Sequence, residues 1–193
     1  MNGEMYQKIV KSVRNLLSQR GSVTIAIDGR CGAGKSTLSE ILSEDLAANV
    51  FHADDFFLTP EMRNEQRMSE PGGNLDRERL TDEVLIPLSQ KNDVSYRRYD
   101  CSERCILPAV TIPFRPVNIV EGSYSCHPEM AKYYDFKIFV DVDPARQAER
   151  IIAREGEEKS KMFFEKWIPL EEKYFGFFDT RSSCDIIVNF DKK

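Results

Sequence analysis

The chain has 193 residues, of which 41% are hydrophobic and 31% are charged, and its formal net charge is −5. This length suits one compact domain with a substantial core, and no apolar stretch reaches the roughly 20 residues that a membrane-spanning helix needs. The negative charge argues against wide contact with nucleic acid, so we expect a small-molecule partner and neither a nucleic acid nor a membrane.

The cysteine content indicates a reducing compartment. Five cysteines are scattered along a chain whose first twenty residues lack the apolar core and the cleavage site of a secretion signal. We therefore expect free thiols and a cytoplasmic protein. Cys101 and Cys105 have a spacing found in zinc sites, but no second pair of cysteine or histidine ligands lies nearby, so no zinc site is predicted.

The first predicted elements surround a phosphate-binding motif. Apolar residues at helical spacing predict a helix within residues 1–20, and a short β-branched run predicts a buried strand over residues 23–27. Residues 29–36 then read GRCGAGKS, which is the pattern GxxxxGKS, and helical spacing resumes over residues 36–46. Strand, glycine loop and helix is the order that a phosphate-binding loop requires, so the sequence predicts a nucleoside triphosphate site.

The chemistry of this loop assigns a role to each part of it. Backbone N–H groups of the loop can close around the β- and γ-phosphates at the positive end of the following helix. Lys35 adds a cation, which we expect to act in catalysis, and Ser36 offers its hydroxyl to Mg²⁺. We therefore expect ATP and Mg²⁺ as cofactors, with the choice between ATP and GTP left open. The residues expected to bind the nucleotide are Gly29, Gly32, Ala33, Gly34, Lys35, Ser36 and Thr37.

The middle of the chain predicts the region that holds a second ligand. A strand over residues 49–53 ends at two aspartates, and the charged stretch that follows is unusually long for a loop inside a compact domain. We interpret residues 56–75, approximately, as a substrate loop. A helix is predicted from Asp76 to Leu88, and residues 94–116, which three prolines interrupt, predict short extended pieces that form a hairpin insert.

The second half of the chain completes an alternating pattern. Strands are predicted over residues 117–120, 136–140 and 185–188, and helices over 144–155 and 162–175. Strands alternate with helices throughout, so we predict an α/β fold of three layers, in which helices cover both faces of a mostly parallel sheet. We expect a single domain over residues 1–193, with a lid at about residues 154–162.

Three carboxylates follow predicted strands. Ligands of such sheets bind at the carboxyl ends of the strands, which is where Asp54, Asp55 and Glu121 fall. We expect Asp54 to act as the base toward an attacking hydroxyl and Glu121 to lie on the magnesium side, with Asp55 able to replace either. One acid after a strand equally fits a helix cap or a turn, but three acids downstream of a phosphate loop favour the catalytic interpretation.

Arginines recur every four residues at positions 146, 150 and 154, and on a helix that begins at Pro144 they form one stripe. We expect this stripe to border a mobile lid and Arg150 and Arg154 to be catalytic, with at least one of them contacting the transferring phosphate; a solvated charged face is the alternative. The aromatic residues between positions 163 and 178 fit a platform for a base or core packing, and we favour core packing.

With these motifs, the sequence resembles the uridine kinase-like family of P-loop kinases, which includes phosphoribulokinase-like and nicotinamide riboside kinase-like enzymes. The likeness runs from about residue 23 to residue 188. It implies a P-loop NTPase fold with a small hairpin region on the substrate side. The segments that carry it are Ile25-Ala26-Ile27-Asp28-Gly29, Lys35-Ser36-Thr37, Asp54-Asp55-Phe56-Phe57, Asn74-Leu75-Asp76, Tyr96, Ile119-Val120-Glu121-Gly122, Arg150 with Arg154, Trp167-Ile168-Pro169 and Cys184-Asp185-Ile186-Ile187.

The resemblance implies roles and also shows departures. It implies that Asp54 is the base, that Asp76 accepts a ribose hydroxyl and that Tyr96 forms a wall of the substrate pocket, while Glu121 is the magnesium-side acid. Residues 96–100 read YRRYD and lack the histidine with which uridine kinases read the pyrimidine, and the lid has fewer arginines, so uridine itself is not expected. This segment contains three charged residues, Arg97, Arg98 and Asp100. They either bind another polar acceptor or pair with one another at the surface. Of these we take Arg98 as a substrate-binding residue.

The sequence thus predicts an ATP- and Mg²⁺-dependent kinase that transfers the γ-phosphate to a hydroxyl of a nucleoside or related metabolite. One alternative is a kinase of a non-nucleoside sugar or vitamin. Another is a nucleotide-dependent switch or binding module with slow hydrolysis, although neither a guanine-reading Asn-Lys-x-Asp segment nor a transporter-type Leu-Ser-Gly-Gly-Gln segment is present. The oligomeric state is left open, with a homodimer as one option.

Overall fold

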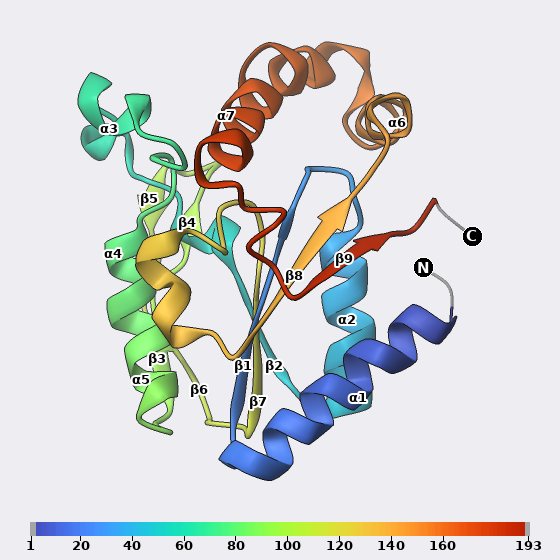
Figure 1. Cartoon of the computed structure of the whole chain (residues 1–193). Coiled ribbons are helices and arrows are strands. Elements are labelled where there is room, and N and C mark those ends of the chain that lie inside the picture. Colours follow the sequence, from blue (N-terminus) through green and yellow to red (C-terminus); the bar gives the residue numbers. More distant parts are fainter. Residues whose placement is uncertain (1–2, 192–193) are drawn as a thin grey trace.

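A parallel sheet of five strands forms the centre of the molecule in a computed structural model that describes residues 3–191 (Figure 1). The strand order is β2-β7-β1-β8-β9, and every pairing between these neighbours is parallel. The predicted α/β class is therefore confirmed. The strands are β1 (Val23–Gly29), β2 (Asn49–His52), β7 (Val117–Glu121), β8 (Phe136–Asp141) and β9 (Ile186–Asn189).

Helices cover both faces of this sheet, as Figure 1 shows, with α1 and α2 on one face and α4 and α5 on the other. The helix predicted within residues 1–20 begins at Gly3 among the described residues, and positions 1 and 2 lie outside them. The helices are α1 (Gly3–Arg20), α2 (Lys35–Leu46), α3 (Glu65–Ser69), α4 (Arg77–Leu80), α5 (Ile86–Ser89), α6 (Pro144–Met162) and α7 (Ile168–Phe178).

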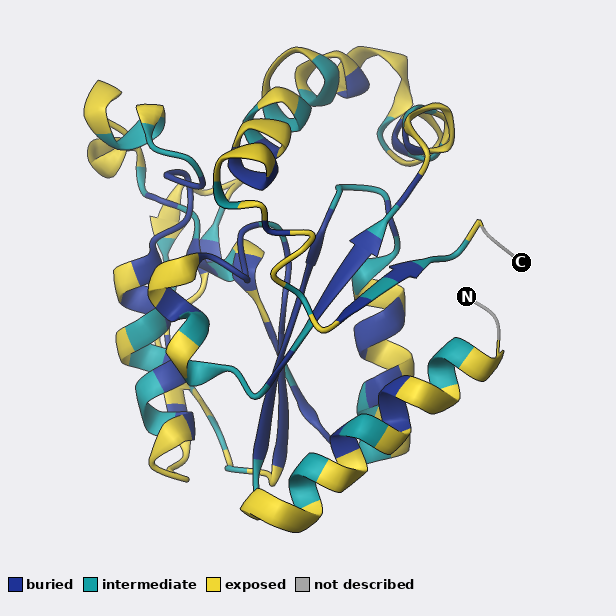
Figure 2. Ribbon diagram, in the orientation of Figure 1, coloured by how far each residue is buried: buried dark blue, intermediate teal, exposed yellow. Residues whose placement is uncertain are grey.

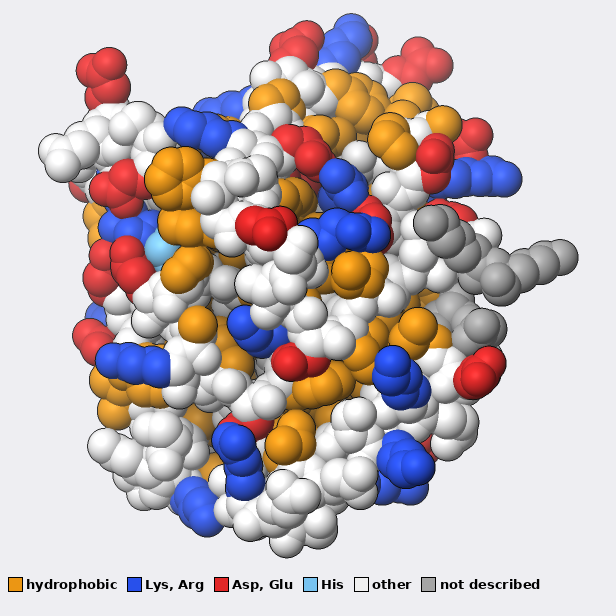
Figure 3. All heavy atoms as spheres, viewed as in Figure 1, with side chains coloured by type: hydrophobic (Ala, Val, Ile, Leu, Met, Phe, Trp, Pro, Cys, Tyr) orange, Lys and Arg blue, Asp and Glu red, His pale blue; other side chains and the backbone are white. Residues whose placement is uncertain are grey.

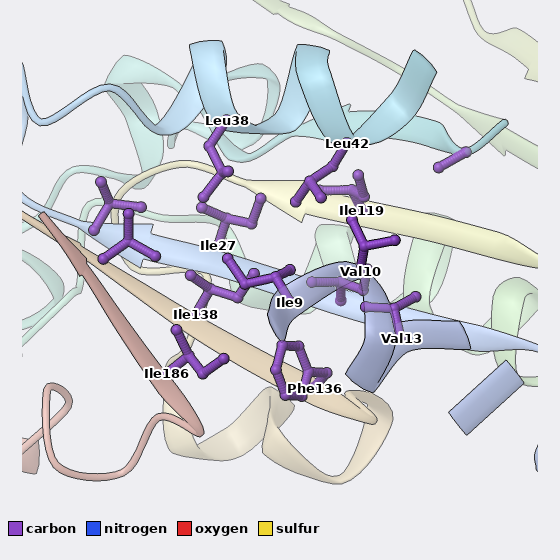
Figure 4. Close-up of a cluster of buried hydrophobic side chains, with 14 of the residues drawn as sticks. Ile9, Val10, Val13, Ile27, Leu38, Leu42, Ile119, Phe136, Ile138 and Ile186 are labelled. Atoms are coloured by element: carbon purple, nitrogen blue, oxygen red, sulfur yellow. The ribbon is translucent and has the colours of Figure 1, made fainter. Parts of the chain in front are cut away.

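The first face of the sheet is covered by the apolar stripes of α1 and α2 (Figure 4). Ile9 and Val13 of α1 and Leu38 and Leu42 of α2 are fully buried against strand residues such as Ile27. Complete burial of one such side chain contributes about 1.5–3 kcal/mol. This packing holds α2, and with it the loop that precedes α2, against the end of β1.

The second face is covered by α4, α5, α7 and the segments between them. Successive residues of a strand point to opposite faces, so that Ile138 of β8 belongs to the first cluster while Phe139 packs with Phe175 of α7 in the second. Figure 2 shows the resulting dark blue sheet between helices that are exposed on their outer faces. A sheet buried on both faces explains why its strands read as continuous apolar runs.

Two helical segments differ from the prediction at a proline. The helix expected from Asp76 to Leu88 is α4, a π-helical turn over Thr81–Leu85 and α5, and the π-helical turn Phe163–Trp167 joins α6 to α7 in the same way. Each π turn directly precedes an Ile-Pro pair, at Pro87 and at Pro169. Because proline has no N–H and its ring crowds the preceding turn, the regular hydrogen-bond ladder cannot continue there.

Helix α6 consists of two helical stretches that meet at Gly156. The first ends near Glu155, as predicted, and the second continues to Met162 beyond the non-helical Gly156, whose φ is 79° and ψ 166°. Glycine readily adopts a positive φ, and because the backbone of Gly156 is not helical, the helix is interrupted there and the chain changes direction. The segment expected to form a lid is therefore helical on either side of Gly156.

The hairpin insert expected at about residues 94–116 contains two antiparallel pairs. Strand β3 (Val94–Tyr96) pairs with β6 (Val110–Ile112), and β4 (Tyr99–Asp100) pairs with β5 (Cys105–Ile106). The expected substrate loop contains the short 3₁₀ turn Pro60–Met62 and α3. Both insertions lie between β2 and β7 in the chain, the substrate loop after β2 and the hairpin insert after α5.

The face of the molecule drawn in Figure 3 carries interspersed acidic and basic side chains and shows no large area of one charge. None of the helices within residues 3–191 has both the length and the apolar composition that crossing a lipid bilayer requires.

Candidate functional site

A cavity of about 1190 Å³ lies where β1, β2 and β7 end. Crevices at the carboxyl ends of parallel strands are the usual ligand sites of such sheets. One side, the loop half, is formed by residues 31–37, by α6 through Arg150 and Arg154, and by Phe190. The other side, the hairpin half, contains Asp54, Phe57, Arg63, Asn74, Tyr99, Cys101 and Arg104. Figure 1 shows that α6 and the β4–β5 pair lie on opposite sides of the sheet's upper edge.

Glycines let the loop of residues 29–36 take its shape. Gly34, at the N-terminus of α2, has a φ of 100°, and a Cβ there would lie 3.1 Å from the Phe190 ring. Gly29 has a different function, because a Cβ at this position would lie 2.0 Å from the Val140 carbonyl oxygen of β8. Gly29 does not line the cavity, and its N–H donates to Asp28 Oδ1 at 2.7 Å, so it shapes the loop from behind.

The other residues predicted to bind the nucleotide, at positions 32–37, all line the cavity. Lys35 Nζ donates to the carbonyl oxygens of Gly29 at 2.7 Å and Arg30 at 3.2 Å. These bonds hold the ammonium group at the mouth of the loop, where a triphosphate can replace them. The loop thus presents a cation and the N-terminus of α2 in one place, which suits an anion.

Ser36 and Glu121 bring oxygen ligands together beside the loop. Strand register places Glu121 of β7 next to Ile27 of β1 and His52 of β2. The Ser36 hydroxyl donates to Glu121 Oε1 at 3.3 Å, and the same oxygen lies 2.6 Å from His52 Nδ1, which raises the pKa of His52. Within residues 3–191 no group of three metal-ligating side chains is found.

The donor set of Ser36 and Glu121 fits Mg²⁺. This ion prefers oxygen ligands and commonly takes only one or two from the protein, keeping waters and substrate phosphate oxygens for the rest. A hydroxyl and a carboxylate directly beside a phosphate-binding loop meet that requirement. No sequence motif marks His52, and only the register of β2 against β7 reveals its carboxylate partner.

The two aspartates after β2 have different surroundings. Asp54 lines the cavity, and although solvent reaches it there, protein surrounds it on most sides, so that burial raises its pKa against the opposing effect of Lys35. Asp55 does not line the cavity. Its pKa is also raised by burial, while His52 and Arg98 favour the charged form. Geometry thus favours Asp54 as the residue that meets a ligand.

The arginine stripe of α6 divides into two parts. Arg150 and Arg154 line the cavity, whereas Arg146 pairs with Glu149 outside it. Arg150 donates to the Gly32 carbonyl oxygen at 3.1 Å and to Asp191 at 2.6 Å. Arg154 donates to Glu155 at 2.7 Å. Two of the three arginines therefore lie where a phosphate bound in the loop would meet them.

Solved structures with the same fold are known, although no protein-family model and no curated protein matches the sequence. A possible uridine kinase from Bacillus stearothermophilus has a TM-score of 0.71 at 20% identity, with 96% of this chain and 100% of that one covered. A candidate fructose transport system kinase from Silicibacter sp. TM1040 has a TM-score of 0.68 at 21% identity, with 92% and 97% covered. YFH7 from Saccharomyces cerevisiae, a candidate P-loop kinase with a circular permutation, has a TM-score of 0.61 at 13% identity, with 96% and 99% covered.

The chain has the P-loop kinase fold. Likeness at these identities shows the fold, and it agrees with the resemblance inferred from the motifs. In this fold the expected site residues fall into a group that lines the cavity and a group that does not.

Three residues that were expected to bind the substrate, Asp76, Tyr96 and Arg98, lie outside the cavity. Asp76 is buried at the start of α4, where its carboxylate accepts from Arg79 N and Arg79 Nε, both at 3.0 Å. Tyr96 is buried against Phe51 and Phe56, with ring centroids 5.6 and 5.7 Å apart. The third, Arg98, is exposed on the surface. Asp55, which was also expected to bind the substrate, does not line the cavity either.

The remaining charged residues of the YRRYD segment have local partners. Arg97 pairs with Glu83, not with Asp100. Asp100 accepts from the N–H and hydroxyl of Ser102 at 2.8 and 2.5 Å and from Glu103 N at 3.1 Å, so it closes the turn between β4 and β5. Arg97 and Asp100 therefore neither line the cavity nor pair with each other. Each is bound by a neighbour that the sequence did not indicate.

The aromatic cluster was interpreted as core packing, which holds for only part of it. Tyr174 and Phe175 of α7 are buried. Phe163 and Trp167 line the cavity, and Phe177 is 69% exposed, so for these three the interpretation is wrong. Phe163 and Trp167 are the first and last residues of the π-helical turn before Pro169, and this turn changes the helical register between them and the buried pair in α7.

Two buried carboxylates that support the site were not predicted. Glu171 of α7 is 3% exposed and accepts from Cys31 N in the loop at 3.0 Å and from the Ser123 hydroxyl at 2.5 Å. It joins α7 to the phosphate-binding loop. No sequence pattern marks it, because its partners are 140 and 48 residues away.

Asp28 is fully buried behind the loop, and burial raises its pKa to about 6. Its position at the end of β1 lets it collect donors from three segments, which ties the loop, the segment after β7 and α7 together. Its donors are Gly29 N, Tyr124 N, Cys126 N and the Tyr174 hydroxyl, at 2.7 to 3.1 Å.

Proposed function

We propose that the protein is an ATP- and Mg²⁺-dependent kinase that transfers the γ-phosphate to a hydroxyl of a small metabolite. The observation that supports this most directly is a single continuous cavity with the phosphate-binding loop on one side and Asp54 on the other. A kinase must hold the triphosphate and the attacking hydroxyl in one space from which bulk water is largely kept away. A volume of about 1190 Å³ is large enough for both ligands.

In this proposal, loop amides and Lys35 hold the β- and γ-phosphates, and Arg150 and Arg154 neutralise charge that develops on the transferred group. Asp54 orients the acceptor hydroxyl and takes its proton as the new O–P bond forms and the bond to the leaving ADP oxygen breaks. Ser36 and Glu121 would hold Mg²⁺, which supplies charge neutralisation between the β- and γ-phosphates when bound. A raised pKa suits Asp54 as a base, because a more basic carboxylate takes the proton more readily.

The acceptor is the part of this function that the fold leaves open. Two of the similar structures are named as a possible uridine kinase and a candidate fructose transport system kinase, which supports a hydroxyl-bearing metabolite as the first class to test. Nucleosides and related ribosyl compounds remain our sequence-based expectation, with sugars and vitamins as the alternative. A cytoplasmic location and a single domain also stay predictions. The expectation of free thiols agrees with the structure, in which all five cysteines are free.

Coupled ADP release from the purified protein tests the proposal. We expect ATP consumption that requires Mg²⁺ and rises on addition of at least one member of a panel of nucleosides, sugars, hydroxy acids, sugar phosphates and vitamins. The phosphorylated product should appear in equal amount to the ADP. ATP hydrolysis that no acceptor stimulates would contradict the kinase and favour a nucleotide-dependent switch.

A further inference from the structure

The hairpin half of the cavity contains two arginines without a carboxylate partner. Within residues 3–191, neither Arg63 nor Arg104 takes part in an ion pair, whereas Arg150 pairs with Asp191 and Arg154 with Glu155 in the loop half. Both arginines are exposed to the solvent of the cavity, and two unpaired guanidinium groups on one cavity wall offer a planar set of donors to a carboxylate or phosphate.

Arg63 is held at this wall by contacts that leave its outer nitrogens available. Its Nε donates to the Leu58 carbonyl oxygen at 3.0 Å, and its guanidinium lies over the Tyr99 ring, 5.9 Å from the centroid. Such anchoring reduces the entropy lost on binding, since the planar group is already oriented. Arg104 lies in the turn between β4 and β5 and makes no hydrogen bond among the described residues.

Asn74 supplies an independent sign of a ligand. The residue is 6% exposed and lines the cavity, and its Oδ1 is a buried atom without a hydrogen-bond partner within residues 3–191. A buried amide oxygen left unpaired costs about 1–3 kcal/mol, so such atoms usually mark a place where a bound group completes the structure. The oxygen itself has almost no accessible surface, so a ligand hydroxyl reaches it only if the Asn74 side chain rotates toward the cavity.

We propose that the acceptor is a small hydroxylated anion, such as a sugar acid or a sugar phosphate, whose negative group binds Arg63 and Arg104 and whose hydroxyl groups meet Asn74 and Asp54. This inference rests on the proposed function, because it assigns the hairpin half to the acceptor. It explains why the hairpin half combines two cations with only one lining carboxylate, Asp54, in a protein whose net charge is −5. A neutral nucleoside would leave both guanidinium groups without a partner.

Matched pairs of neutral and anionic probes test the proposal by binding alone. The pairs are glucose with gluconate, glycerol with glycerate, and ribose with ribose 5-phosphate, titrated calorimetrically into protein saturated with Mg²⁺ and a non-hydrolysable ATP analogue. The analogue occupies the loop half, so that anions cannot bind there. We expect at least one anion to bind about tenfold more tightly than its neutral counterpart, and more weakly as salt rises. The carboxylate and phosphate arms distinguish the two kinds of anion.

Variants separate this proposal from an unspecific attraction. Arg104→Gln, which removes no internal contact, and Arg63→Gln should each reduce the preference for the anion to less than about threefold. Arg14→Gln, the same charge change at an exposed position of α1, should leave it intact. Asn74→Ala should weaken both members of a pair without changing their ratio. Equal affinity within every pair, failure of all anions to bind, or a preference that survives loss of both arginines overturns the inference.

The same titrations distinguish this inference from the proposed function. If the anion binds through Arg63 and Arg104 but never stimulates ADP release, the kinase proposal fails while the anion site stands. If a neutral alcohol stimulates ADP release and no anion binds, the kinase proposal stands and the anionic acceptor is excluded.

Discussion

The two halves of the cavity differ in how their polar groups are satisfied. In the loop half, Lys35 is bonded to two carbonyl oxygens, Arg150 to Asp191 and the Cys31 amide to Glu171. In the hairpin half, Arg63 and Arg104 have no ion-pair partner and Asn74 Oδ1 has no hydrogen-bond partner among residues 3–191. The charged side chains of the loop half thus have partners within the protein, whereas two cations of the hairpin half have no carboxylate partner and one of its amide oxygens has no donor among residues 3–191.

This difference separates the part of the site that binds a ligand common to many enzymes from the part that selects the acceptor. A triphosphate is the same for many enzymes, and a contiguous loop suffices to bind it, with internal bonds that keep the empty loop in shape. An acceptor differs from one enzyme to the next, so its site is assembled from side chains that only this fold brings together. The following predictions test whether the two halves act as separate units.

Asp54 of the hairpin half is the residue assigned to the reacting hydroxyl, so its loss should have the largest effect. We expect Asp54→Asn to lower kcat about 10³-fold while the affinity for nucleotide changes less than threefold, because a base acts in the transition state and not in nucleotide binding. Steady-state kinetics and calorimetry measure the two quantities. Asp55→Asn is the matched control and should lower kcat less than tenfold; a larger effect of Asp55→Asn would reverse the assignment.

Lys35 tests the loop half by itself. Lys35→Ala should lower kcat about 10²-fold and also weaken nucleotide binding, since the ammonium group contacts the phosphates before and during transfer. The affinity for the acceptor should change little when it is measured without nucleotide. Lys11→Ala, at an exposed position of α1, provides the control. A Lys35 variant that loses acceptor affinity instead would show that the halves are not separate.

Glu171 tests how α7 supports the loop. Glu171→Ala leaves the Cys31 amide without its acceptor and should lower the free energy of unfolding by about 2 kcal/mol. Its neighbour Glu172 is an exposed partner of Arg30, and Glu172→Ala should cost less than about 1 kcal/mol. Urea denaturation of both variants gives the comparison. Equal losses would mean that the buried contact contributes no more than the surface ion pair.

The pH dependence of kcat/KM gives the smallest expected effect. Burial raises the pKa of Asp54, so the carboxylate is protonated, and inactive as a base, at pH values where an ordinary aspartate is still charged. We expect kcat/KM to fall as the pH decreases, with a midpoint above about 4, the usual aspartate pKa. Circular dichroism at each pH excludes unfolding as the cause. A midpoint at or below about 4 would count against Asp54 as the base.

Much of the loop half could be predicted because its signals are local. Residues 32–37 are contiguous, the flanking strand follows from a short apolar, β-branched run, and the flanking helix follows from a periodicity of 3.6 residues. Arg150 and Arg154 followed from their four-residue spacing on a helix. Gly29 was included with the others, although its place is set by the close approach of β8, which no local pattern shows.

For the hairpin half the sequence indicated Asp54 and the two segments that hold the other members, residues 56–75 and 94–116, but nothing local distinguishes which side chains within these segments reach the cavity. The expected substrate contacts Asp76 and Tyr96 are sequestered by Arg79 and by Phe51 with Phe56, and these partners depend on how α4 and β3 pack. The two arginines of the hairpin half, Arg104 and Arg63, come from the turn after β4 and from the loop before α3, outside every recognised motif.

By itself, the sequence determined the alternating strands and helices, the phosphate-binding loop and the placing of acids after strands, since each depends on neighbours within a few residues. Only the tertiary structure decided which aspartate faces the cavity, which histidine meets Glu121, and which arginines remain unpaired. Those outcomes depend on strand register and on contacts between segments as far apart as Cys31 and Glu171, and such contacts exist only once the sheet has formed.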